Sequence, residues 1–160
     1  MSQVYCIDTS AIIDAWVETY RPASFPSFWE RIDELVRKGE LISPEEVRQE
    51  LKYPAELGAW AADRDEMFIE LESGFQVEVK AVVSHLTEMM KQRGLRFLGK
   101  DLKADPFVVA LARHRSAVVI SHEGSHGSQG RPKIPDICRE YGMKGPIRIA
   151  DLIEEEGWTF

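Results

Sequence analysis

Carboxylates that follow buried strands are the residues of this chain best placed to do chemistry. Asp8 stands directly after the apolar run 4–7, which has the composition of a strand buried in a parallel sheet. Glu123 stands just beyond a second apolar run, 117–120. Open α/β folds bind their ligands at the carboxyl edge of the sheet, so both acids are expected at that edge.

Two further acids are predicted on helices that reach the same edge of the sheet. Glu50 lies late in a helix predicted over 44–52, where Ser43 is the expected N-cap and Glu46 is expected to complete a capping box. Asp105 starts a helix that is apolar on nearly every side and is therefore expected to be buried. The capping role leaves Glu46 out of the predicted site.

Each acid also has a purely structural alternative. Asp8 or Thr9 could simply cap the helix after the first strand, and Asp105, which precedes a proline, could be an N-cap. Glu50 could be an ordinary solvated glutamate. Several carboxylates in one cleft, however, repel each other unless a divalent cation neutralises them. The predicted cofactor is therefore Mg²⁺ or Mn²⁺, and sites of this kind activate water against phosphodiesters.

Composition and charge limit the classes of protein to consider. The 160 residues, 44% of them hydrophobic and 29% charged, predict one globular domain with a core. No apolar run could cross a membrane and residues 1–3 begin no signal peptide, so we expect a cytoplasmic protein without a membrane partner. Cys6 and Cys138 fit no zinc or redox spacing and are expected to be reduced core thiols. The net charge of −7 argues against phosphate binding by the whole surface.

Strand and helix patterns alternate along the chain. Strands are predicted over 4–7, 41–42, 117–120 and 147–149, and helices over 11–17, 44–52, 55–71, 135–141 and 151–156, with three more starting at 27, 79 and 105. This order predicts a single domain over 1–160, a three-layer α/β/α sandwich with a central parallel sheet of about four to five strands. Residues 121–133, rich in Gly, Ser, His and Gln, are predicted to form a loop.

The order and spacing of these features resemble the PIN-domain family, the metal-dependent ribonucleases that include the VapC-type toxins of toxin–antitoxin pairs. The family's opening of strand, Asp and then Ser or Thr is similar to Tyr-Cys-Ile-Asp-Thr-Ser at 5–10. Its second, third and fourth acidic motifs are similar to 42–51, to Asp105 with Ala110 and Ala112, and to Ser-His-Glu at 121–123. The segments 134–138 and 147–158 look like the family's ending.

The resemblance implies a hydrolase, an endoribonuclease that cleaves RNA phosphodiesters with a metal-activated water. Asp8 and Asp105 would be the principal metal ligands, with Glu50 and Glu123 completing the catalytic site directly or through water. Ser10 and Thr9 would orient a ligand or a coordinated water. Asp101 is a further accessory candidate from its position alone, one helical step before Asp105 in a predicted loop. Family membership also implies a small antitoxin protein that buries the cleft, and often a homodimer.

Two features depart from the family pattern. The fourth acid is Glu123 rather than Asp, with Ser121 in place of Thr, and residues 54–96 form a longer helical insertion than compact toxins carry. The chain particularly resembles a little-characterised PIN-like branch of about this length. Two alternatives stay open: a PIN-like RNA-binding or interaction module without turnover, and a housekeeping RNA-processing nuclease.

Basic side chains near the predicted site are weaker candidates, for contact with the RNA backbone. They are Arg96, Lys100, Lys103 and His122. The structural alternative for the three cations is a solvated helix end with its loop. His122 and Glu123 also begin a His-Glu-x-x-His pattern that ends at His126, but the surrounding glycines and serines disfavour the helix that a zinc protease needs.

Other chemistries have less support in the sequence. An aspartyl-phosphate phosphatase usually has a second acid two residues after its nucleophile, and Ser10 stands there instead. The chain contains no glycine-rich phosphate-binding loop of the dinucleotide or Walker type, so nucleotide-cofactor chemistry is not predicted.

Overall fold

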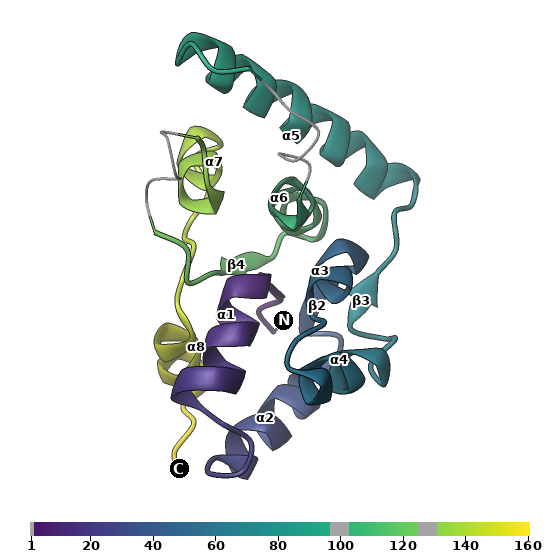
Figure 1. The fold of residues 1–160 in the computed structure, drawn as a ribbon, viewed down its shortest axis with the longest axis vertical. Coiled ribbons are helices and arrows are strands. Elements are labelled where there is room, and N and C mark those ends of the chain that lie inside the picture. Colours follow the sequence, from purple (N-terminus) through teal and green to yellow (C-terminus); the bar gives the residue numbers. More distant parts are fainter. Residues whose placement is uncertain (1, 97–102, 125–130) are drawn as a thin grey trace.

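The computed structural model describes residues 2–96, 103–124 and 131–160; Lys100, Asp101 and His126 lie outside them. Within the described residues the core is a four-stranded parallel sheet in the order β3-β2-β1-β4 (Figure 1). Its strands are β1 (Tyr5–Ile7), β2 (Leu41–Pro44), β3 (Phe68–Ile69) and β4 (Val118–Ile120). Helices flank the sheet, so the predicted α/β sandwich with a parallel sheet is confirmed.

Eight α-helices and one π-helical turn surround this sheet in the described part of the chain. They are α1 (Thr9–Asp14), which continues as the π-helical turn η1 (Ala15–Thr19), α2 (Pro26–Arg37), α3 (Glu45–Glu50), α4 (Ala55–Ala62), α5 (Ser73–Gln92), α6 (Ala104–Arg115), α7 (Ile134–Glu140) and α8 (Ile149–Glu156). None of these helices has the length and apolar character that a membrane span requires.

The register of β1 and β4 aligns the residues that follow them. Ile7 pairs with Ile120, and the ladder continues as the Asp8 N–H donates to the Ile120 carbonyl at 2.9 Å. Both strands run in the same direction, so Asp8 and Ser121 come next at one edge. The Asp8 carboxylate and the Ser121 hydroxyl therefore lie side by side at the carboxyl edge of the sheet.

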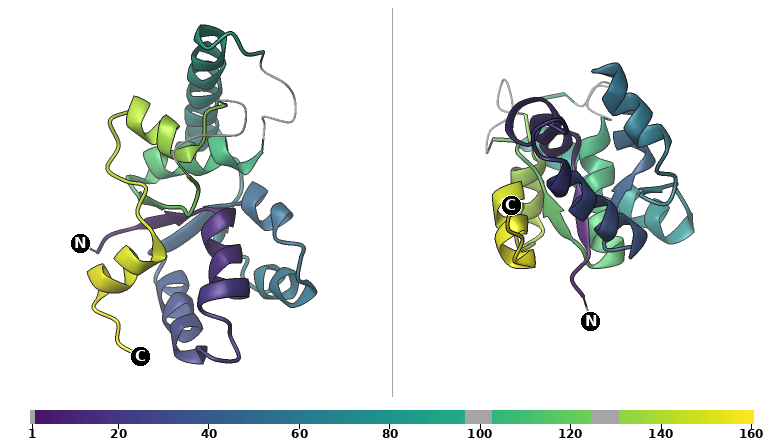
Figure 2. Two further views of the ribbon diagram at one scale, coloured as in Figure 1. Left: turned by 60° about the vertical axis from the view of Figure 1, so that its left-hand side comes forward. Right: turned by 90° about the horizontal axis from the view of Figure 1, so that it is seen from below.

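Helix α6 packs across β1, β2 and β4 on one face of the sheet, and α5 lies outside it (Figure 2). Residues Val108 to Ala112 of α6 are all buried, which explains why the sequence is apolar around this whole helix. A short connection joins α6 to the start of β4, so the helix runs antiparallel to the strands. Its first turn, which carries Asp105, therefore lies at the carboxyl edge.

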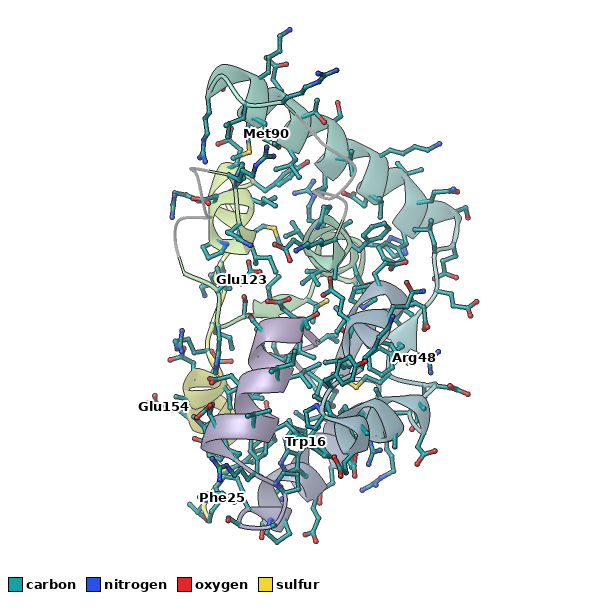
Figure 3. All side chains as sticks on the ribbon, in the orientation of Figure 1. Trp16, Phe25, Arg48, Met90, Glu123 and Glu154 are labelled. Carbon is teal, nitrogen blue, oxygen red and sulfur yellow. The ribbon has the colours of Figure 1, made fainter. Side chains whose placement is uncertain are left out.

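Helices α1 and α2 lie on the other face of the sheet (Figure 1). There an aromatic cluster joins η1 and α2 to α4, and Trp16 of this cluster is labelled in Figure 3. The ring centroids of Trp16 and Trp29 are 5.0 Å apart, and those of Trp29 and Trp60 are 5.4 Å apart. Edge-to-face packing of this kind gives a stabilising contribution beyond simple burial. The cluster holds η1 in place, and with it α1, whose first turn follows Asp8 directly.

The strand predictions need two corrections at the sheet's margins. The helix predicted over 55–71 ends at Ala62, and Phe68–Ile69 then forms edge strand β3, which pairs with β2. The segment 54–96 therefore contributes a strand as well as helices. The strand predicted over 147–149 is a single bridge from Ile147 to Ile120, because Ile149 already begins α8.

The predicted capping box at the start of α3 is wrong. Ser43 belongs to β2, and its hydroxyl donates to the Ile7 carbonyl at 2.7 Å, so the side chain joins two strands. The N-cap position is occupied by Pro44, which has no side-chain donor or acceptor. Among the described residues Oε1 of Glu46 is buried without a hydrogen-bond partner, and burial raises the pKa of this carboxyl.

Candidate metal centre

Three of the predicted acids meet at the carboxyl edge of the sheet. Asp8 ends β1, Asp105 lies in the first turn of α6, and Glu123 follows β4 and lies between α7 and α1 in Figure 3. One carboxylate oxygen of each lies within 4.8 Å of those of the other two. Lys103 is the N-cap residue of α6, so Asp105 is not the N-cap, and its carboxylate joins this acidic cluster instead.

Two hydroxyls orient the Asp8 carboxylate. Ser10 Oγ donates to Oδ2 of Asp8 at 2.6 Å, and Ser121 Oγ donates to the same oxygen at 2.9 Å. Each serine oxygen also accepts a backbone N–H, from His122 for Ser10 and from Glu123 for Ser121. Hydrogen bonds of this kind fix the orientation of a metal-binding carboxylate. Ser10 therefore acts here through Asp8.

Glu50 lies beside the acidic cluster but is not one of its three members. Thr9 Oγ1 donates to Oε1 of Glu50 at 2.6 Å, and the Ala104 N–H approaches Oε2 at 3.4 Å. These contacts come from the neighbours of Asp8 and Asp105, so the helix α3 does bring Glu50 to the same edge. Glu50 is exposed, and Thr9 holds this side chain.

The cluster is electrostatically unfavourable while all its carboxylates are charged. Burial, and then the charge of Glu123, raise the pKa of Asp8 to about 6, although the Ser10 and Ser121 hydrogen bonds oppose the shift. Burial and the charges of Glu123 and Asp8 raise the pKa of Asp105 well above its ordinary value. A divalent cation would relieve this repulsion, since oxygen ligands are those that Mg²⁺ and Mn²⁺ prefer.

The loop after β4 places Glu123 by hydrogen bonds at both ends of the residue. Its N–H donates to Ser121 Oγ at 3.1 Å, and its Oε2 accepts the N–H of Ile134 at 3.1 Å. Ile134 is the first residue of α7, so this helix start and the end of β4 together orient the third carboxylate.

The His122 side chain links parts of the protein interior by hydrogen bonds. This side chain is only 10% exposed, and Nδ1 lies 2.5 Å from Oδ2 of Asp14. Nε2 accepts the N–H of Ile149 at 3.1 Å, so the ring proton is on Nδ1 and is donated to Asp14. Both nitrogens have partners inside the protein, which leaves neither for the RNA phosphate contact that the sequence suggested. Residues 121–124 form no helix, so the zinc-protease reading has no support.

Of the remaining predicted cations, those within the described residues lie on the surface, and sequence reasoning missed another cation that stands beside the acids. Arg96 and Lys103 are exposed. Lys133 precedes α7 directly, and its charge lowers the pKa of Asp105 against the effect of burial. The adjoining loop sequence carried no spacing that would have singled Lys133 out.

Comparisons with known proteins place the chain in one family. A search of proteins with curated descriptions found no match. A solved structure described as the crystal structure of VapBC2 from Rickettsia felis bound to a DNA fragment from their promoter is similar at a TM-score of 0.47 and 14% sequence identity, and the match covers 76% of this chain and 88% of that chain. The family model described as Domain of unknown function (DUF4411) matches residues 5–160. The chain therefore belongs to the DUF4411 family.

Proposed function

We propose that this protein is a metal-dependent endoribonuclease that hydrolyses phosphodiester bonds of RNA. The observation that supports this most directly is the meeting of Asp8, Asp105 and Glu123, whose carboxylate oxygens lie within 4.8 Å of one another although they come from three separate elements. Three acids gathered in one cluster, Asp8 buried and the other two half-buried, cost stability, so a cation-binding role explains them better than a structural one. The likeness of the sequence to PIN-domain motifs supplies the choice of RNA as substrate.

The chain's own residues have separable roles in this proposal. Asp8, Asp105 and Glu123 would hold the cation, Mg²⁺ or Mn²⁺, while Ser10 and Ser121 hold the Asp8 carboxylate in place. Glu50, exposed at the edge of the cluster, would act through water. When bound, the cation would supply Lewis acidity and a more acidic water at neutral pH.

Partners and surroundings follow from the same proposal. RNA backbone would run past the exposed side chains of Arg96 and of Lys103, the N-cap residue of α6. We extend the toxin–antitoxin reading to a small antitoxin that covers the acidic cluster, and to a homodimer of this chain. Cys6 and Cys138 are free, buried thiols, which suits a reducing, cytoplasmic environment.

The test is a cleavage assay with purified protein and end-labelled RNA, with Mn²⁺ or Mg²⁺ and with a chelator. Asp8→Asn should abolish metal-dependent cleavage, because it removes one anionic ligand from the cation. Asp63→Asn, an exposed acid at the end of α4, is the matched control and should cleave like the parent chain.

Two results would reject the proposal. An Asp8→Asn variant that cuts RNA as well as the parent would show that the acidic cluster is not the catalytic site. Metal-dependent RNA binding by the parent chain without new RNA ends would identify a binding module without turnover.

A further inference from the structure

Helix α7 brings one lysine, Lys133, against the acidic cluster. The Ile134 N–H donates to Oε2 of Glu123 at 3.1 Å, and the Lys133 N–H donates to Oδ2 of Asp136 at 2.9 Å. Asp136 is itself buried, with 4% of its surface exposed. These two hydrogen bonds fix the backbone of Lys133 directly beside the third carboxylate of the cluster.

Lys133 carries its positive charge beside the cluster, on the residue that directly precedes α7. The side chain is half-buried, and its field reaches the Asp105 carboxyl, whose pKa it lowers. Arg48, Arg64 and Arg113 are each held in ion pairs. In the described part of the chain Lys133 is in no such ion pair.

The net charge of the site indicates a function for Lys133. Three ionised carboxylates and one divalent cation leave one negative charge, which would repel a phosphodiester group entering the site. Negative charge on the phosphate oxygens must also be stabilised in the transition state, and a preorganised cation can supply that stabilisation. A lysine beside the cluster meets both requirements.

We propose that Lys133 is a catalytic residue whose ammonium group contacts a non-bridging oxygen of the scissile phosphate. The inference rests on the proposed nuclease function. In the hydrolysis the water oxygen bonds to phosphorus, the bond from phosphorus to one sugar oxygen breaks, and a water proton ends on that oxygen. Lys133 keeps its proton throughout and acts by charge alone.

The test uses the full chain with Lys133→Met and Lys133→Arg, assayed for RNA cleavage at saturating Mn²⁺ and, separately, for Mn²⁺ binding by calorimetry. Lys133→Met should slow cleavage by about 100-fold, the size expected when one group that stabilises developing oxyanion charge is lost. Lys133→Arg, which keeps the charge, should recover most of that loss. Mn²⁺ should bind Lys133→Met at least as tightly as the parent, because removing a cation makes the cluster more negative.

Lys144→Met is the matched control, because this exposed lysine lies near Gln3 and Val118, at the opposite edge of the sheet. It should cleave like the parent chain. Thermal unfolding of each variant checks that the fold is retained.

The outcomes separate this inference from the proposed function. If the parent cuts RNA, Asp8→Asn does not, and Lys133→Met cuts at the parent rate, then only the role of Lys133 is refuted. Mn²⁺ affinity that falls in step with cleavage in Lys133→Met would also refute it, since that pattern marks a structural role. A parent chain that cuts no RNA refutes both.

Discussion

Asp8 is the residue that shows most clearly what the acidic cluster does to stability. It is 1% exposed, and burial raises its pKa from the ordinary value of 3.8 to about 6. A carboxyl with a raised pKa binds its proton more tightly in the folded chain than in the unfolded one. Proton binding by Asp8 therefore contributes fully to the stability of the cation-free protein below about pH 4, and this contribution is lost as the pH rises through about 6.

At the residue scale we predict that Asp8→Asn stabilises the cation-free protein near pH 7. A pKa rise of this size corresponds to about 3 kcal/mol in the free energy of unfolding as an upper limit, and the gain should shrink toward zero near pH 4. Urea unfolding in a chelator at both pH values measures the difference. A gain that is the same at both pH values would show that repulsion at Asp8 is not its cause.

At the scale of the elements, His122 connects the end of β4 to two helices. Its ring bonds to Asp14 at the end of α1 and to the first amide of α8 at Ile149. Its own N–H bonds to Ser10, which holds Asp8. The position of Glu123, the next residue, therefore depends on where α1 and α8 pack.

We predict that His122→Ala weakens Mn²⁺ binding by about tenfold or more, the effect usual for residues that support metal ligands. Asp14→Asn is the conservative comparison. Its amide oxygen can still accept the Nδ1 proton, so it should lose much less affinity. Calorimetric titration with Mn²⁺ measures both variants. Unchanged affinity in His122→Ala would mean that Glu123 is positioned without this connection.

At the scale of the whole molecule, cation binding ties together β1, α6 and the segment after β4. A ligand that binds only the folded state stabilises it, by about 2.7 kcal/mol at a hundred times its dissociation constant. Protons compete with the cation for Asp8, whose pKa of about 6 sets the range of the competition.

Mn²⁺ should therefore raise the midpoint of thermal unfolding more near pH 7.5 than near pH 5. Asp8→Asn should largely lose this response. Scanning fluorimetry with NaCl of equal ionic strength as the control gives the comparison. An equal rise at both pH values, or in the variant, would point to cation binding elsewhere on the chain.

The sequence by itself determined the class of fold and the edge of the sheet at which the acids lie. Apolar runs such as 117–120 alternate with helical patterns, and this order gives parallel strands whose carboxyl ends share one edge. Asp8 and Glu123 follow such runs, and Asp105 begins the helix that leads back to the sheet. Their approach within 4.8 Å follows from local patterns and chain connectivity.

Only the tertiary structure decided which polar groups form hydrogen bonds with each other. The Ser43 hydroxyl bonds to Ile7 across the sheet, whereas the sequence placed it at a helix cap. Likewise the ring of His122 bonds to Asp14 and Ile149, which are both far from it in sequence, and Lys133 stands beside Glu123 because α7 starts there. Strand β3, two residues long, is too short for any periodicity to reveal. Hydrophobic periodicity records which face of an element is buried, but a hydrogen-bond partner is chosen among all the groups that packing brings near.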